Sequence, residues 1–201
     1  MATSNFKPST LDNVNAYRVT NGGSGVTRIE PLWPVAASTT IKAGDLLKLS
    51  SGKLVQALAD PGSDNSLTTS SGNTQIAGVA GESITTDSNG QEIQGTNIKT
   101  MITLVLGDGS IDYLVRLYDA TASNTYLTAL TRGTAYLLGR YRVTSTNLFY
   151  VITTGTSNGE MIYIEPFGQS QQNSSATSLQ TTTSTYAAVW CKIKGTAYAF
   201  A

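Results

Sequence analysis

The sequence predicts a mainly β protein: a small β-barrel or β-sandwich-like body of hairpins, with at most one short helix and extended terminal arms. Gly, Thr, Ser and β-branched residues recur every few positions, and few windows hold an apolar stripe at the helical spacing of about 3.6 residues. Short runs of Val, Ile, Leu and Tyr are instead separated by turn residues. These observations together favour many short strands over helices.

Two hairpins are predicted in the first third of the chain. The clearer one turns at Ser51-Gly52, where glycine supplies the positive φ that a two-residue turn requires. The predicted strand pairs are residues 16–20 with 26–30 across the glycine-rich 21–25, and residues 46–50 with 53–58 across Ser51 and Gly52.

Polar loops and short strands alternate in the next part of the chain. Residues 60–73 contain a proline and two glycines and are too hydrophilic for a core, so they predict a long surface loop. Residues 75–79 predict a short strand. Residues 85–95 predict a turn region around Asn89-Gly90.

The densest apolar runs are residues 101–106 and 111–118, which we expect to pair with each other across residues 107–109. Four of their side chains are predicted to be core: Leu104, Val105, Leu114 and Val115. Ser123 can cap a short helix that ends near Leu130. A meander of three strands is then predicted over residues 134–143, 148–153 and 161–165.

The composition changes at Gly168. Residues 169–185 form a Gln, Ser and Thr tract with Leu179 as the one large apolar residue, and such a tract buries too little surface to offset its ordering entropy. Residues 186–201 are apolar and aromatic. The predicted organisation is therefore an N-terminal arm over 1–16, a β-rich body over 17–168, a polar linker over 169–185 and a C-terminal strand segment over 186–201.

An exposed apolar segment must dock, either on its own body or on a neighbouring molecule. Because the linker is long enough to reach a neighbour, we predict an intersubunit or shell contact for this segment. Trp190 is its expected anchor, since a buried Trp removes the most apolar area per side chain. The candidate interface residues are Tyr186, Val189, Trp190, Ile193, Tyr198 and Phe200.

The net charge and the N-terminal sequence limit the classes of partner that the chain is expected to bind. Lys plus Arg number 13 and Asp plus Glu number 13, so the formal net charge is zero. The electrostatic footprint of a nucleic-acid or anionic-membrane binder is therefore missing. Residues 1–10 hold one Lys and no apolar run, which predicts neither a signal peptide nor a membrane anchor.

Few residues are suited to catalysis or metal binding. The absence of His removes the commonest general base and most transition-metal sites. Two carboxylate pairs are compatible with glycoside chemistry, but their turn and strand-start positions favour structural roles: Asp108 with Asp112, and Glu160 with Glu165. We expect no catalytic residue, no cofactor and no metal site.

Three further features have a plain structural interpretation. The oxygen-rich run 87–92 lacks the full spacing of a calcium loop and predicts a turn. The single Cys191 excludes an internal disulfide and, among apolar neighbours, predicts a buried inert thiol. Six tyrosines in or near predicted strands favour core or interface packing over a sugar-binding platform: Tyr113, Tyr118, Tyr136, Tyr141, Tyr150 and Tyr163.

Residues 34–81 carry a recognisable pattern. An apolar entry leads to Ile41-Lys42-Ala43-Gly44-Asp45-Leu46-Leu47, then to Leu49, Gly52, Leu54 and Val55, and finally to Ile76-Ala77-Gly78-Val79-Ala80. This resembles the capsid decoration, or cement, proteins of tailed bacteriophages, in which a Gly-Asp turn feeds a hairpin and a later strand returns beside it. The signature positions are Ile41, Gly44, Asp45, Gly52 and Gly78. Residues 132–143 and 161–164 resemble the later strands of the same proteins.

The resemblance implies a β-rich body, often a homotrimer, on the outer surface of the virion where major capsid subunits meet. It implies synthesis in the host cytoplasm, no catalysis and no cofactor. The expected partners are the major capsid protein and other copies of the chain, with neither nucleic acid nor membrane among them. The alternative is a receptor- or glycan-binding β module of a phage tail, a fibre or a cell surface.

Overall fold

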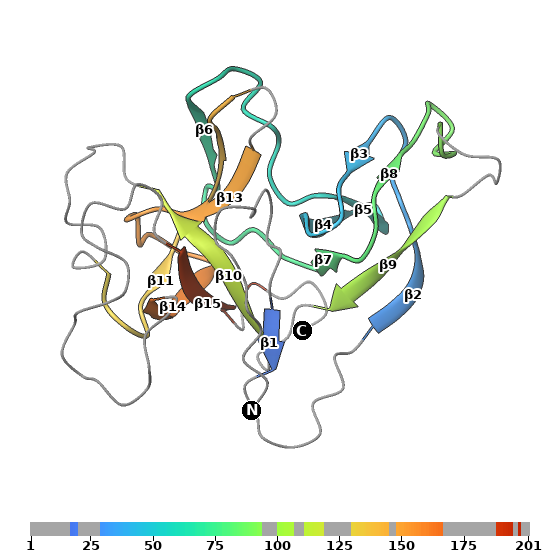
Figure 1. Cartoon of the computed structure of the whole chain (residues 1–201). Coiled ribbons are helices and arrows are strands. Elements are labelled where there is room, and N and C mark those ends of the chain that lie inside the picture. Colours follow the sequence, from blue (N-terminus) through green and yellow to red (C-terminus); the bar gives the residue numbers. More distant parts are fainter. Residues whose placement is uncertain are drawn as a thin grey trace.

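The structure, a computed structural model, describes residues 17–19, 29–93, 100–106, 111–118, 130–144, 148–166, 188–194 and 197. These residues form strands and turns without an α-helix, so the predicted mainly β class is confirmed. None of the elements in these ranges is a helix long and apolar enough to cross a membrane. The strands are distributed over two sheets and one small ladder (Figure 1).

The larger sheet has eight strands in the order β11-β14-β15-β10-β13-β12-β6, and β1 also pairs with β10. Its neighbours are antiparallel except for β10 and β13, which are parallel. Its strands are β1 (Tyr17–Val19), β6 (Ser66–Thr69), β10 (Ile111–Leu117), β11 (Ala135–Tyr136), β12 (Leu138–Arg142), β13 (Leu148–Ile152), β14 (Met161–Pro166) and β15 (Ala188–Ile193). The sheet is thus mixed, and it takes strands from both ends of the described chain.

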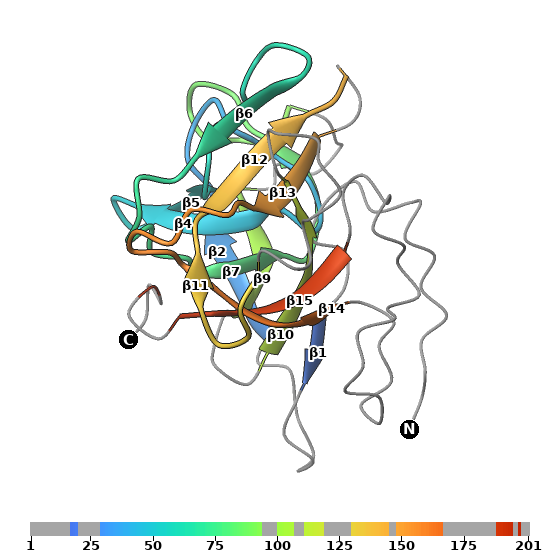
Figure 2. The ribbon, with the colours of Figure 1, turned by 90° about the vertical axis from the view of Figure 1, so that its left-hand side faces the viewer.

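The smaller sheet has five antiparallel strands in the order β2-β9-β7-β4-β5. They are β2 (Ile29–Pro34), β4 (Leu46–Ser50), β5 (Lys53–Gln56), β7 (Gly78–Ala80) and β9 (Met101–Leu106). A two-stranded ladder joins β3 (Thr40–Ile41) to β8 (Ile84–Thr85). Figure 2 shows the larger sheet from the side facing away from the smaller one.

Two apolar clusters hold these layers together. The first lies between the two sheets and takes Leu46 and Val79 from the smaller sheet and Tyr113, Tyr150 and many others from the larger one. The second lies on the other side of the smaller sheet, where its residues pack against those of the β3–β8 ladder: Val35, Ile41, Leu47, Leu54, Ala77, Ala80, Ile84 and Ile102. Because successive side chains of a strand point to opposite faces, Leu46 enters the first cluster and its neighbour Leu47 the second.

The predicted hairpin over residues 46–58 is confirmed. β4 and β5 are antiparallel, with Ser50 opposite Lys53. The two turn residues have positive φ, 50° at Ser51 and 76° at Gly52, as a type I′ turn requires. The predicted turn around Asn89-Gly90 is also present, since the Asp87 carboxylate accepts the amide protons of Asn89 and Gln91.

Two other predicted pairings are wrong. β9 and β10 are both strands, but β9 pairs with β2 and β7 in the smaller sheet while β10 belongs to the larger one. β1 and β2 do not form a hairpin either, because β1 pairs with β10 and β2 with β9. A short connection can lead from one sheet to the other, so a turn signal alone does not decide which strands pair.

Smaller corrections concern the loop at 60–73 and the meander. The predicted loop contains β6, which pairs with β12. β12 and β13 form the predicted hairpin, but β14 pairs with β11 and β15 instead of joining β13. Leu114 and Val115 are buried as predicted. The predicted helix at 123–130, apart from Leu130, and the side chains of Leu104 and Val105 lie outside the described residues.

The C-terminal strand lies in the middle of the larger sheet, which corrects the prediction of a separate docking arm. β15 is hydrogen-bonded to β14 on one side and to β10 on the other. Val189, Cys191 and Ile193 enter the first cluster and are at most 1% exposed. The segment docks on its own body because its alternating apolar side chains fill a gap between two apolar strands. The predicted linker at 169–185 lies outside the described residues.

We expect deletion of residues 168–201 to abolish cooperative unfolding, because it removes the strand between β14 and β10. The milder change Ile193→Ala should lower the free energy of unfolding by about 2 to 5 kcal/mol. Urea denaturation followed by circular dichroism measures both effects. Lys53→Ala, at an exposed position, is the control; a truncated protein that unfolds like the full chain would contradict the placement of β15.

Candidate functional site

The Gly44-Asp45 turn stands at the start of β4, where the chain enters the hairpin. Gly44 has φ 86°, and its N–H donates to the Ala80 carbonyl at 2.8 Å. The Asp45 carboxylate accepts the Lys42 amide proton at 2.9 Å, and the Asp45 N–H donates to the Lys42 carbonyl at 2.9 Å. A short carboxylate that can accept a backbone proton of its own turn favours this conformation. The turn is therefore closed by its own aspartate.

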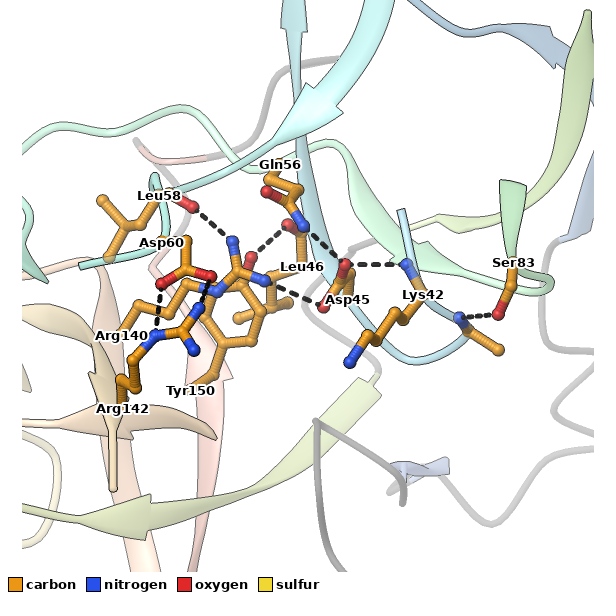
Figure 3. A network of polar contacts seen from close by, with 11 residues as sticks. Lys42, Asp45, Leu46, Gln56, Leu58, Asp60, Ser83, Arg140, Arg142 and Tyr150 are labelled. Atoms are coloured by element: carbon orange, nitrogen blue, oxygen red, sulfur yellow. Dashed lines mark hydrogen bonds and ion pairs between the residues drawn. The ribbon is translucent and has the colours of Figure 1, made fainter. Parts of the chain in front are cut away.

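The same carboxylate is fully buried and makes contacts beyond the turn (Figure 3). Gln56 on β5 donates from Nε2 to Oδ2 at 3.0 Å. Arg140 on β12 forms an ion pair with Oδ1 at 3.6 Å. Asp45 thus joins the turn, the hairpin and the larger sheet.

Arg140 provides the matching half of the connection. Its side chain is 2% exposed, and Nη1 donates to the Leu58 carbonyl at 2.8 Å. The guanidinium lies 5.1 Å from the centre of the Tyr150 ring, and the Tyr150 hydroxyl donates to the Leu46 carbonyl at 3.0 Å. Burial raises the pKa of Tyr150 well above its usual range, which keeps it a hydrogen-bond donor. Two strands of the larger sheet therefore bind the smaller sheet through polar groups.

This buried polar network is suited to structural support. The Asp45 carboxylate contacts the Lys42 amide, the Gln56 side chain and the Arg140 guanidinium. The Arg140 guanidinium contacts the Leu58 carbonyl, the Asp45 carboxylate and the Tyr150 ring. A buried ion pair fixes geometry, because leaving either charge alone in the interior is costly. The arrangement holds the Gly-Asp hairpin in one position on the larger sheet.

Glu160 forms a second buried polar centre. Its carboxylate is fully buried and accepts protons from the Ser70 hydroxyl at 2.8 Å and from the amides of Thr74 and Leu138 at 3.0 and 3.1 Å. Its carbonyl accepts the Lys194 amide proton at 2.7 Å. The residue ties the chain after β6 and the chain after β15 to the start of β12.

The other carboxylates considered for catalysis have cationic neighbours. Asp112 is fully buried and lies 3.6 Å from the Lys192 ammonium, and Glu165 lies 3.4 Å from the Arg132 guanidinium. Asp108 is outside the described residues. Within the described ranges, no group of three His, Cys, Asp or Glu side chains could hold a metal ion.

The predicted signature residues come together around the hairpin. Ile41 is buried in the second cluster, Gly52 forms the β4–β5 turn, and Gly78 on β7 lies opposite Leu47 on β4. The candidate interface residues are separated: Val189 and Ile193 are core, and Trp190 is half-buried on β15. Tyr186, Tyr198 and Phe200 lie outside the described residues.

The aromatic and thiol predictions can be compared with the observed burial. Five of the six tyrosines are buried and the sixth, Tyr118, is half-buried against Tyr141 with ring centres 4.5 Å apart. Cys191 is buried as predicted, and burial raises the pKa of its thiol. The reading of these residues as packing groups is confirmed for the buried ones.

Arg140 is the functional residue that the sequence interpretation missed. It lies on β12 opposite Tyr150 of β13 and is buried, although an arginine is almost never fully buried unless it is paired. The sequence does not reveal its partner, because Asp45 is far away in the chain and lies in the turn just before β4 of the smaller sheet.

Replacing Arg140 by Met should lower the free energy of unfolding by about 3 to 5 kcal/mol, because Asp45 is then left buried without its cation. The double change Arg140→Met with Asp45→Asn should lose less than the single change, since no unpaired charge remains. Urea denaturation at neutral pH measures these differences. Arg142→Met, two residues along on β12 and paired with the partly exposed Asp60, is the matched control and should have a much smaller effect; equal losses would contradict the proposed support role.

Cys191 should react with a thiol reagent only when the protein opens, because the thiol is buried and its pKa is raised. We expect the labelling rate at neutral pH to rise with urea in step with the fraction unfolded. Fast labelling in the absence of denaturant would contradict the central position of β15. The measurement is absorbance of the released thiolate over time.

Comparison of the chain with family models, with curated proteins and with solved structures finds no match.

Proposed function

We propose that the chain is a capsid decoration protein of a tailed bacteriophage, which stabilises the shell by binding its outer surface where major capsid subunits meet. The observation that carries this proposal is the hairpin around Gly44-Asp45. A Gly-Asp turn leads into β4 and β5, and β7 returns antiparallel to β4, with Leu46 opposite Val79. This is the arrangement that the sequence resemblance implies for residues 34–81.

The buried network gives the hairpin a mechanical role. A decoration protein stabilises the shell by holding neighbouring capsid subunits together. The parts of the protein that bind those subunits must therefore be rigid. Asp45 and Arg140 fix the hairpin to the larger sheet across the first cluster. A rigid body of this kind loses little conformational freedom on binding, which favours affinity.

The charge balance supports a protein partner. The formal net charge is zero, so binding energy has to come from apolar burial and hydrogen bonds more than from long-range attraction. Among the described residues, the large apolar side chains that are exposed are Ile93, at 60%, and Met101, at 38%. Ile93 follows the β3–β8 ladder, where its N–H donates to the Thr85 carbonyl of β8, and Met101 begins β9 of the smaller sheet.

On this proposal the chain is made in the host cytoplasm, binds the major capsid protein and other copies of itself as a homotrimer, and uses no cofactor. Sedimentation equilibrium at micromolar concentration tests the trimer.

The test of the function is co-sedimentation with expanded, DNA-free heads assembled from the major capsid protein of the same phage. We expect saturable binding in a fixed ratio to capsid subunits and a higher temperature of head disruption. Bovine serum albumin and unexpanded heads are the controls. Absence of binding to heads, together with binding to a glycan array, would favour the alternative of a glycan-binding tail or fibre module.

The double change Ile93→Ser with Met101→Ser should weaken head binding without lowering stability, because both side chains are exposed in the free protein. Binding is measured by the same co-sedimentation, and folding by urea denaturation. Val55→Ser, at a half-buried position of β5, is a comparison that removes apolar area elsewhere on the smaller sheet. Unchanged binding by the double variant would exclude this part of the surface from the contact.

A further inference from the structure

The edge strands at the ends of the two sheets are β2 and β5 in the smaller sheet and β11 and β6 in the larger one. They differ in how their outer edges are protected. β2 contains Pro31 and Pro34, which lack an amide proton to offer. β5 is covered by the chain after β2, where the Ala36 N–H donates to the Leu54 carbonyl at 3.0 Å. β11 lies against Gly159, where a Cβ would stand 2.5 Å from the carbonyl carbon of Tyr136. β6 is the fourth of these strands.

The direction of the backbone groups of β6 follows from two hydrogen bonds. The Ser70 N–H donates to the Leu138 carbonyl at 2.8 Å, and the Thr153 N–H donates to the Leu137 carbonyl at 3.0 Å. Paired groups alternate along an antiparallel ladder. Ser66, Thr68 and Ser70 therefore turn their backbone groups towards β12, while Leu67 and Thr69 turn theirs away from it.

The outward side of β6 is bare in the described part of the chain. No described group bonds to the outward N–H or carbonyl of Leu67 or Thr69. The strand holds no proline, no charge and no bulge, which are the usual protections of an edge. Its side chains are half-buried at three positions and exposed at Thr69.

We propose that β6 is an acceptor edge that pairs with an extended segment of the capsid shell protein and so extends the larger sheet on binding. This inference rests on the proposed function for the identity of the partner. The chemistry of the edge, alternating amide protons and carbonyls at strand spacing, is complementary to a polypeptide in β conformation and to no small ligand class.

The length of β6 favours the shell over a second copy in solution. Two outward residues offer at most about four backbone hydrogen bonds. Their small net contribution does not offset the loss of translational and rotational freedom when two free molecules associate. On a shell, other contacts already hold the protein in place. The strand pairing then costs no further translational or rotational freedom, so its hydrogen bonds add to the affinity.

Leu67 favours an apolar side chain at the neighbouring position of the bound segment. It lies opposite Tyr141 on β12, which in turn lies opposite Phe149 on β13. Cross-strand neighbours share a face of the sheet, so these three residues form a row that an incoming strand would continue. An apolar residue beside Leu67 is therefore expected in the bound segment.

Thr69→Pro tests the proposal with little effect on the fold. The substitution removes an outward N–H and leaves the ladder with β12 intact, because the inward bonds belong to Thr68 and Ser70. Thr69→Val keeps the amide and the β-branched shape and is the matched control. We expect wild type and Thr69→Val to bind expanded heads equally, and Thr69→Pro to bind about tenfold more weakly, with the urea midpoint unchanged.

Hydrogen exchange gives a second readout that needs no variant. The Leu67 and Thr69 amides should exchange fast in the free protein and become protected on heads, while the Thr68 amide should be protected in both states. If wild type binds heads but Thr69→Pro binds equally and these amides stay unprotected, the edge proposal is wrong and the function stands. If wild type binds no heads, the proposed function fails first. A wild-type dimer that Thr69→Pro converts to monomer would overturn the shell segment in favour of a second copy.

Discussion

The ion pair between Asp45 and Arg140 is the interaction on which the relation of the two sheets depends. Apolar contacts hold the sheets together, but such contacts are not directional and tolerate sliding. The two buried charges attract each other, and each is also held by directional hydrogen bonds, from the Lys42 amide and Gln56 to Asp45 and from Arg140 to the Leu58 carbonyl. This network converts a general attraction between two layers into one defined arrangement.

The same network explains why the hairpin sequence has the form it has. Gly44 allows the backbone to turn with positive φ, and Asp45 can then close the turn with one carboxylate oxygen while the other faces Arg140. A neutral residue at position 45 would lack the charge that pairs with Arg140. The turn is therefore local in the chain, but it is stabilised by Arg140 on the distant strand β12.

The sequence predicted the local elements well and their partners poorly. The β4–β5 hairpin follows from Ser51-Gly52 because turn and strands are neighbours in the chain. β9 and β10 were correctly placed as strands, but their apolar residues on both faces fit several partners equally, so proximity along the chain was misleading. β6 escaped prediction because an edge strand needs few apolar residues. Arg140 could be suspected as buried, yet nothing in the sequence connects it to Asp45.

The central position of β15 has a consequence for how the molecule is made. Residues 188–193 pair with residues 111–117 on one side and 161–166 on the other. During synthesis β10 and β14 emerge before β15, the strand that lies between them in the sheet. The larger sheet can close only once residue 193 has left the ribosome, so folding is delayed by long-range pairing, and the growing chain exposes two adhesive strand edges to its neighbours in the meantime.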